Sequence, residues 1–302
     1  MRVVVTGATG FIGRHVVPAL LDRGYEVHVV TSGRGGQDTS RLIWHRLNIL
    51  DPGGSRTLFE QVRATHLVHL AWVVDPGAFW TSRENLRWVG ASLDLVRTFV
   101  ESGGKRIVIA GTCAEYRWGV QDLSEETTPL EPRSLYGASK DALRRILATL
   151  AVQERVELAW GRLFFLYGPH EPPVRLVPSV TTALLRGEVA HCASGRAERD
   201  YLYVADAGEA MAAILDSAIL GPVNIASGTA VQTREIITQV GEECGRPDLI
   251  SLGALPDRPD DPDRICADVR RLRGDVGWTP RVPLDEGIHL TVRWWRDRLR
   301  AA

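Results

Sequence analysis

The sequence predicts an α/β protein built around a doubly wound parallel sheet, followed by a smaller α/β lobe. Short apolar runs alternate with longer segments that carry apolar residues at helical spacing, the order expected when helices connect parallel strands. The first run, residues 3–5, is β-branched and does not alternate with polar residues, as expected of a strand covered on both faces. Three glycines spaced three residues apart follow it at once: Gly7, Gly10 and Gly13.

This glycine-rich turn and the helix after it predict a Rossmann domain, over residues 1–167, that binds a dinucleotide. Glycine permits the tight turn, the close approach of backbone to a pyrophosphate, and the packing of the next helix on the strand. That helix ends near Gly24 and would point its free N–H groups at phosphate. An ordinary strand-to-helix turn is the alternative. The expected cofactor contacts in this turn are Gly7, Thr9, Gly10, Phe11, Ile12 and Gly13.

Composition excludes several other classes of protein. The 36 basic and 37 acidic residues give a net charge of −1, which would not draw the chain to nucleic acid or to an anionic membrane. The eight histidines form no H-E-x-x-H or comparable ligand pattern, so we predict no metal site. His66 and His69 point to opposite faces of a strand, so we interpret them as structural. No segment is apolar enough to span a membrane and the N-terminus enters a strand at once, so a soluble cytoplasmic protein is expected. The cysteines lack metal-ligand spacing and should be reduced thiols: Cys113, Cys192, Cys244 and Cys266.

The next strands place further residues at the same edge of the sheet. Where the third strand ends, Asn48 and Ile49 could lie beside an adenine ring. Where the fourth ends, Leu70, Ala71 and Trp72 would pass beneath the cofactor. We expect a long helix over residues 84–101 and strands over residues 26–31, 42–47, 66–71 and 105–111.

The end of the second strand decides which dinucleotide fits. An acidic residue there would bond the ribose hydroxyls of NAD and repel the 2′-phosphate of NADP. Residues 30–34 read Val-Thr-Ser-Gly-Arg, with no acid and with Ser32 and Arg34 within reach. The sequence therefore favours NADP(H) and leaves NAD(H) possible. The alternative is that Arg34 is a solvated loop arginine.

The expected chemistry lies on a helix that opens with Tyr136 and Lys140. Four residues are about one helical turn, so the phenol and the ammonium project from the same face. A free tyrosine has a pKa of about 10. A nearby cation favours the phenolate and brings the group toward the range useful for acid–base catalysis. The pair alone is a frequent accident, but Thr112 stands after the fifth strand, at the carboxyl edge of the sheet where ligands bind.

Together and in this order, these motifs resemble the extended short-chain dehydrogenase/reductase family, which includes nucleotide-sugar epimerases, dehydratases and ketoreductases. The resemblance implies that Tyr136 is the catalytic acid/base, that Lys140 holds the nicotinamide ribose, and that Thr112 hydrogen-bonds the reacting sugar oxygen. It also implies a nucleotide-sugar substrate whose diphosphate contacts Arg199. Further matches, over essentially the whole chain, are residues 163–169 (Leu-Phe-Phe-Leu-Tyr-Gly-Pro), 199–206 and 276–280.

Within this family the sequence favours reduction of a 4-keto sugar. Dehydratases need an acidic pair directly after the Ser/Thr, where this chain has Cys113 and Ala114, and the nearest acid, Glu115, is one residue late. Ketoreductases consume a nicotinamide per turnover and often use NADPH, whereas epimerases retain NAD, so the NADP(H) preference favours a reductase. An epimerase is the alternative. A non-catalytic NADP sensor on the same fold would be expected to lack Tyr136 or Lys140, and both are intact.

Two departures from the family pattern concern the substrate. Phe165 stands where the family often has an Asn that contacts the substrate's phosphates, and Trp88 stands where a small residue or Asn is common. With Trp72 and Trp118 these aromatic residues would stack on a sugar or base, or else belong to the core. Cys113, beside Thr112 on the substrate side, is interpreted as a packed thiol because no basic residue flanks it.

Residues 168–302 are expected to form mainly the substrate-binding lobe, with some segments returning to the first domain. An acidic, proline-rich loop is expected over residues 256–262. By analogy with relatives, the helices over residues 84–101 and 136–152 would form a four-helix homodimer interface. The other expected elements are helices over residues 176–186, 205–219, 233–243 and 284–299, and strands over residues 201–203 and 223–225.

Overall fold

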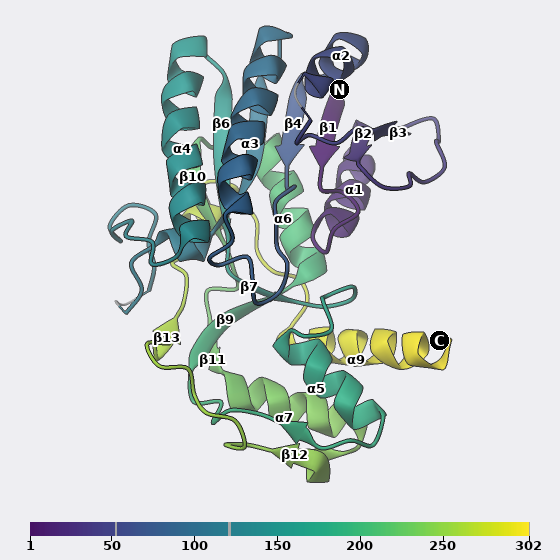
Figure 1. The fold of residues 1–302 in the computed structure, drawn as a ribbon, viewed down its shortest axis with the longest axis vertical. Helices are drawn as coiled ribbons and strands as arrows, with labels where there is room; N and C mark the ends of the chain where they lie inside the picture. The colour runs from purple at the N-terminus through teal and green to yellow at the C-terminus, as the bar shows by residue number, and fades with distance from the viewer. Residues whose placement is uncertain (52, 120–121, 302) are drawn as a thin grey trace.

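A computed structural model of the chain, shown in Figure 1, describes residues 1–51, 53–119 and 122–301. Ala302, the end of the expected lobe, lies outside the described residues. The chain forms a large sheet flanked by helices and a smaller lobe below it, and the arrowheads of β1 and β4 point toward that lobe (Figure 1). The carboxyl edge of the sheet therefore faces the lobe.

The central sheet has seven parallel strands in the order β10-β6-β5-β4-β1-β2-β3, which confirms the predicted doubly wound sheet. The chain runs outward from β1 through β2 and β3, then crosses to β4 and continues the other way. Ligands bind at such a switch point in open α/β sheets. The strands are β1 (Arg2–Thr6), β2 (Glu26–Thr31), β3 (Leu42–Arg46), β4 (His66–His69), β5 (Arg106–Thr112), β6 (Glu157–Leu163) and β10 (Gly221–Ile225).

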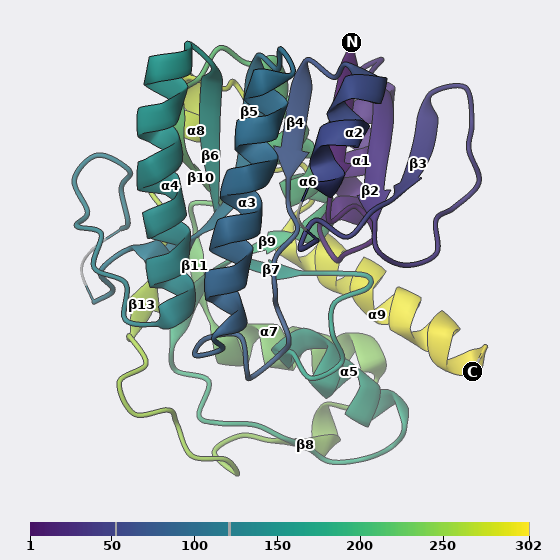
Figure 2. The same ribbon diagram turned by 45° about the horizontal axis from the view of Figure 1, so that its top comes forward.

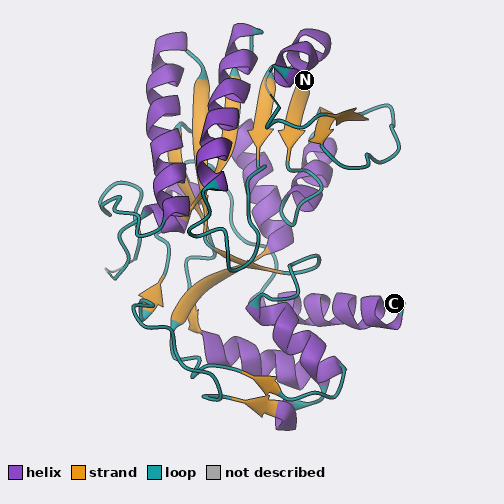
Figure 3. Ribbon diagram, in the orientation of Figure 1, coloured by secondary structure: helices purple, strands orange, loops and turns teal. Residues whose placement is uncertain are grey.

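Helices cover both faces of this sheet, as Figure 2 and Figure 3 show. The first strand explains why its valines do not alternate with polar residues. Val3 and Val5 pack into the core beneath α1 (Gly13–Asp22) and α6 (Val204–Asp216), whereas Val4 packs into the core beneath the helices of the other face. Those helices are α2 (Gly54–Val62), α3 (Glu84–Glu101) and α4 (Leu135–Glu154).

The smaller lobe has its own sheet and core. Strand β9 lies in the middle of this sheet, parallel to β7 and β13 and antiparallel to β11. Val177, Ile236 and Ile288 from three helices meet in its core. The strands are β7 (Phe165–Tyr167), β9 (Glu198–Tyr203), β11 (Ala230–Gln232) and β13 (Arg264–Ile265), with β8 (Ala190–His191) paired to β12 (Ile250–Ser251). The helices are α5 (Leu176–Leu185), α7 (Thr233–Cys244) and α9 (Leu284–Arg300), and α8 (Arg270–Gly274) and the short η2 (Pro247–Leu249) complete the chain.

One buried carboxylate holds the two parts together. Asp200, in β9, accepts hydrogen bonds from the backbone N–H groups of Ser227 (2.8 Å), Gly228 (2.9 Å) and Ala267 (3.2 Å). These partners follow β10 of the large sheet and β13 of the small one. Buried backbone donors need such acceptors, so this aspartate fixes the lobe against the edge of the large sheet.

Most element boundaries agree with the expectations from sequence, and the differences have local causes. The helix expected over residues 205–219 ends at Asp216, because the buried guanidinium of Arg106 donates to the carbonyl oxygens of Ile214, Leu215 and Ile219. Helix α2 was not expected, because it begins in a glycine pair that is typical of a loop. No helix among the described residues is both long and apolar enough to cross a membrane.

Candidate active site

The glycine-rich turn fits a bound pyrophosphate. Gly7 has a φ of +73°, and a Cβ on it would lie 2.7 Å from the backbone nitrogen of Ala71. A Cβ on Gly13 would collide with the carbonyl oxygen of Gly7, so α1 packs on the turn as the sequence predicted. Helix α1 has no side-chain cap and no acidic residue in its first turn. Its positive dipole end is therefore available to phosphate, although the N–H groups of Arg14, His15 and Val16 already donate to backbone carbonyl oxygens.

A buried histidine, His69, links the strand before this turn to helix α3. His69 Nδ1 lies 2.6 Å from Thr6 Oγ1, which also accepts a hydrogen bond from the backbone N–H of Ala71. His69 Nε2 lies 2.8 Å from Ser92 Oγ in α3. Burial, aided by the charge of Lys140, lowers the pKa of His69 to about 3. His66 packs its ring edge-on to Tyr25 instead, so the two histidines are structural and face apart as expected.

The expected adenosine side of the site is open. Ser32 and Arg34 are exposed, and Thr31 Oγ1 accepts a hydrogen bond from the backbone N–H of Gly33 at the end of β2. Asn48 is half-buried and its amide donates to Asp51 Oδ1 over 3.0 Å, which shapes the turn after β3. Ile49, Leu70 and Ala71 are likewise half-buried.

Tyr136 and Thr112 meet at the carboxyl edge of the sheet. Tyr136 lies in the first turn of α4, and its backbone N–H donates to the carbonyl oxygen of Trp80 over 3.1 Å. Burial raises the pKa of Tyr136, and a hydrogen bond with Thr112 opposes that rise. We expected the cation of Lys140 to lower this pKa, but burial raises it, and the groups that oppose the rise are Thr112 and Arg175. Tyr136 is therefore a protonated hydroxyl at neutral pH.

Lys140 lies one turn further along α4, almost fully buried. Its ammonium donates to the carbonyl oxygen of Ala110 over 2.9 Å and lies 3.8 Å from the ring centroid of Trp72. Burial lowers the pKa of Lys140 to about 7, while the negative charge of Glu115 opposes the fall. The charge of this lysine is thus sensitive to its surroundings near physiological pH.

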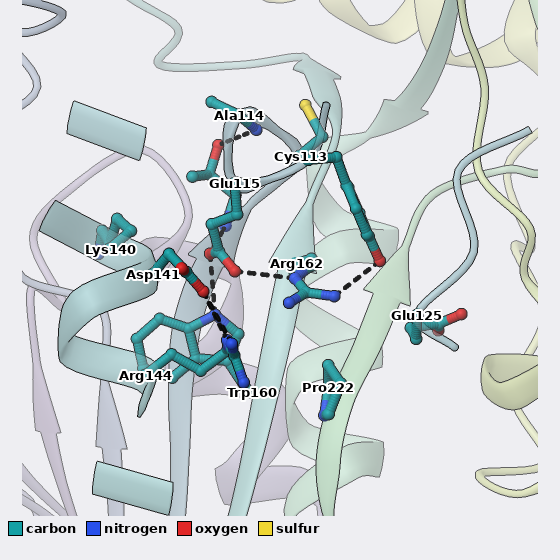
Figure 4. Close-up of polar contacts among 12 residues, drawn as sticks. Cys113, Ala114, Glu115, Glu125, Lys140, Asp141, Arg144, Trp160, Arg162 and Pro222 are labelled. Atoms are coloured by element: carbon teal, nitrogen blue, oxygen red, sulfur yellow. Dashed lines mark hydrogen bonds and ion pairs between the residues drawn. The ribbon is translucent and has the colours of Figure 1, made fainter. Parts of the chain in front are cut away.

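A buried ion pair shapes the turn that follows Thr112. Figure 4 shows Glu115, in η1 (Cys113–Glu115), directed toward Arg162 on β6, and the pair is joined over 2.8 Å. The carboxylate also accepts hydrogen bonds from the backbone N–H of Thr112 (2.8 Å) and from Trp160 Nε1 (2.9 Å). The Glu115 carboxylate is therefore already held by Arg162, Trp160 and the backbone of Thr112.

Two aromatic residues beside Tyr136 were not expected at the site. The rings of Phe79 and Trp80 meet the Tyr136 ring edge-on at centroid distances of 4.9 Å and 5.7 Å. Trp118 lies edge-on to Trp80 at 6.3 Å, and its indole N–H donates to the carbonyl oxygen of Cys113. The sequence reads as a plain loop at this point, and the adjacent Phe-Trp pair in it was the available signal.

The other aromatic residues that the sequence suggested for the pocket lie in two different parts of the structure. Trp72 and Trp88 pack against each other in the core beneath α3 and α4. Phe165 lies by Tyr201, with the Arg199 guanidinium 5.6 Å from its ring centroid. Phe165 and Arg199 are therefore neighbours in the structure.

Arg199 has a charged partner in the fold, and Cys113 is a buried thiol. The Arg199 guanidinium is buried and pairs with Asp261 of the acidic loop over 2.7 Å. A diphosphate would have to share or displace that carboxylate. Burial raises the pKa of Cys113 to about 12, as expected of a packed thiol rather than a nucleophile.

Comparison with known proteins gives matches over nearly the whole chain. Residues 3–226 match the model of the NAD dependent epimerase/dehydratase family. UDP-glucuronic acid decarboxylase 1 of Xenopus tropicalis is 27% identical over 99% of this chain and 73% of that protein. The structure of UDP-glucose 4-epimerase from Thermotoga maritima with UDP-glucose is 26% identical, with a TM-score of 0.87 over 99% of this chain and 100% of that one. UDP-glucose 4-epimerase from Thermus thermophilus in complex with NAD is 30% identical, with a TM-score of 0.83 over 98% and 99% of the two chains.

The Glu115–Arg162 pair generates a prediction about stability. Glu115→Gln leaves the buried Arg162 charge without its partner, so we expect the free energy of unfolding to fall by about 3 kcal/mol. Urea unfolding at pH 7 measures this loss. The double variant Glu115→Gln with Arg162→Met should recover at least half of it. The exposed pair of Glu84 and Arg87 serves as control, since Glu84→Gln should cause no measurable loss. A stable Glu115→Gln protein would contradict the role given to the pair.

The end of β2 generates a prediction about the cofactor. Thr31→Asp places a carboxylate where it would repel a 2′-phosphate, so we expect the affinity for NADPH to fall at least ~10-fold relative to that for NADH. Isothermal titration calorimetry with both nucleotides measures the ratio. The neutral variant Thr31→Asn controls for the change of shape. An unchanged ratio in Thr31→Asp would show that this position does not face the adenosine ribose.

Proposed function

Because the chain belongs to the NAD dependent epimerase/dehydratase family, we propose that it is an NAD(P)-dependent oxidoreductase acting on a nucleotide-linked sugar. The match supports the resemblance to the extended short-chain dehydrogenase/reductase family found from the motifs. The observation that carries the proposal is the meeting of Tyr136, Thr112 and Lys140 at the sheet edge, beside a turn that fits a dinucleotide. The Thermotoga maritima and Thermus thermophilus structures, solved with UDP-glucose and with NAD, support the substrate and cofactor classes.

The proton chemistry belongs to Tyr136. Its hydroxyl is protonated at neutral pH because burial raises its pKa. It can therefore donate a proton to a sugar carbonyl oxygen as that oxygen gains negative charge, while Thr112 Oγ1 holds the same oxygen by a hydrogen bond. A nicotinamide bound beside these residues would supply or accept the hydride at the sugar carbon. Lys140 would hold the ribose hydroxyls of that cofactor.

Elimination of water is not favoured by this site. A dehydratase needs a carboxylate near the sugar carbons to remove a proton, and Glu115 is the carboxylate nearest in sequence to Thr112. It is fully buried and already bound to Arg162, Trp160 and the backbone of Thr112. Cys113 and Ala114 offer no base in its place. Hydride transfer at a single carbon is the reaction that the residues present can support.

Two reactions fit this description, and we place 4-ketosugar reduction first. The absence of an acid at the end of β2, with Arg34 exposed beyond it, supports NADP(H), and the protonated Tyr136 suits reduction of a ketone. Epimerisation is the second candidate, favoured by the likeness to two UDP-glucose 4-epimerase structures, one of them a complex with NAD. An epimerase would retain its dinucleotide between turnovers, whereas a reductase must exchange it.

Assembly and location complete the proposal. We propose a cytoplasmic homodimer whose subunits pair through α3 and α4. Leu86 on α3 is 59% exposed, and Ile146 and Val152 on α4 are 50% and 80% exposed. Apolar side chains at this exposure would be covered in such a pairing.

The role of Tyr136 can be tested by removing one oxygen atom. Tyr136→Phe should cut turnover of a 4-keto nucleotide sugar at least ~100-fold, the scale of acid–base contributions, with cofactor affinity nearly unchanged. Stopped-flow loss of NADPH absorbance measures turnover. Tyr25→Phe is the matched control, because the Tyr25 hydroxyl donates to Asp216 far from the site. Turnover like that of the natural protein in Tyr136→Phe would refute the mechanism.

Cofactor retention separates the two candidate reactions. For a reductase we expect no nucleotide to copurify, and at least ~10-fold tighter binding of NADPH than of NADH, because the β2 end carries no acid. Mass spectrometry of the purified protein and calorimetric titration of the stripped protein measure both. Tightly retained NAD would make the epimerase the correct assignment and would contradict the cofactor preference.

A further inference from the structure

The ammonium of Lys140 lies against an aromatic face. Lys140 Nζ is 3.8 Å from the ring centroid of Trp72 and donates to the carbonyl oxygen of Ala110 over 2.9 Å. An ammonium has three donors, and one carbonyl oxygen satisfies one of them. Both side chains are buried, at 3% and 8% exposure, so the indole face takes a place that water would otherwise occupy.

The indole cannot turn away from the lysine. Trp72 Nε1 donates to Asn85 Oδ1 over 2.8 Å, and Asn85 Nδ2 donates to the carbonyl oxygens of Phe79 (2.7 Å) and Ser82 (2.8 Å). Asn85 is fully buried at the start of α3. Trp88, one turn along α3, packs against the Trp72 ring at a centroid distance of 6.2 Å. Hydrogen bonding and packing therefore hold the ring in one orientation.

The same asparagine links Trp72 to Tyr136. The loop that Asn85 holds includes Trp80, whose carbonyl oxygen accepts the backbone N–H of Tyr136 over 3.1 Å. Tyr136 and Lys140, the two proposed catalytic residues of α4, thus both contact one hydrogen-bonded group formed by Trp72, Asn85 and residues 79–82.

We propose that Trp72 is a positioning residue for Lys140, whose indole face holds the ammonium in place and favours its charged form in a site closed to water. The expected effect on turnover rests on the proposed function. The contact between Lys140 and Trp72 itself is present in the protein without cofactor. Three other groups face or adjoin the ammonium: Glu115 from η1, His69 from β4 and Tyr136 on the same helix. Glu115 also favours the charged form, and His69 is neutral at pH 7 because burial lowers its pKa.

Tryptophan fluorescence of the cofactor-free protein tests the contact without any assay of the reaction. As the pH rises, the Lys140 ammonium loses its proton and the charge at the Trp72 indole face disappears. The tryptophan emission should therefore change with a midpoint near pH 7, because burial lowers the pKa of Lys140 to about 7. The variants Trp72→Phe and Lys140→Met should both abolish this transition. Trp294→Phe is the control, because the Trp294 ring lies against His170 (centroids 4.6 Å apart) and the Arg298 guanidinium (5.3 Å) in α9 rather than against Lys140. That variant should retain the transition.

The pH dependence of turnover tests the role. Trp72→Leu keeps an apolar side chain but removes the ring face, so the pKa of Lys140 should fall and the alkaline limb of kcat should move to lower pH by about one unit. At pH 8 we expect kcat about 10-fold lower with little change in KM for the nucleotide sugar. Trp72→Phe should recover most of kcat because it restores an aromatic face. Circular dichroism and thermal melts confirm that the variants are folded.

The outcomes separate this inference from the proposed function. A transition near pH 7 that persists in Trp72→Phe and Trp72→Leu would overturn the contact. An unmoved alkaline limb in Trp72→Leu would overturn the role of the contact. Absence of any turnover of nucleotide sugars by the natural protein, with the fluorescence transition lost in the Trp72 variants, would refute the proposed function and leave the Trp72–Lys140 contact standing.

Discussion

The buried pair of Glu115 and Arg162 is the interaction on which the site depends. Two buried opposite charges beside the end of β5 are stable there because each is paired with the other and bonded to neutral groups around them, with only Arg162 Nη2 lacking a partner among the described residues. Glu115 binds the backbone N–H of Thr112, and Arg162 donates to the Tyr116 hydroxyl, which in turn donates to Asn224 on β10. The pair therefore fixes the turn that presents Thr112, and it joins β5, β6 and β10 at the edge where the lobe begins.

The same pair also limits the chemistry that the protein can carry out. The Glu115 carboxylate already binds Arg162, Trp160 and the backbone of Thr112, so it cannot act as a base on a sugar carbon. In the proposed mechanism this leaves Tyr136 as the proton-transferring group, with its pKa raised by burial. The structural use of Glu115 and the proposed catalytic use of Tyr136 are thus two results of one arrangement.

Burial sets the charge states of the site more strongly than pairwise attraction does. The phenol of Tyr136 and the ammonium of Lys140 lie on one face of α4, yet the ammonium donates to Ala110 and rests on Trp72. Desolvation raises the pKa of the tyrosine and lowers that of the lysine. Because burial lowers the pKa of Lys140 toward neutral pH, its charge is responsive to its aromatic neighbour, and a bound dinucleotide would alter the same balance.

Short-range patterns in the sequence are enough to predict the doubly wound sheet, the glycine turn, and the placing of Tyr136, Lys140 and Thr112. An apolar β-branched run, a glycine with positive φ and an i, i+4 pair on a helix are properties of a few neighbouring residues. Which distant groups meet is decided only by tertiary packing. The pairing of Glu115 with Arg162, 47 residues later in the chain, the packing of Trp72 under Lys140, and the loop of Phe79 and Trp80 beside Tyr136 depend on how strands and helices stack. No local pattern carries that information, because the free energy that selects those contacts comes from burying the whole sheet at once.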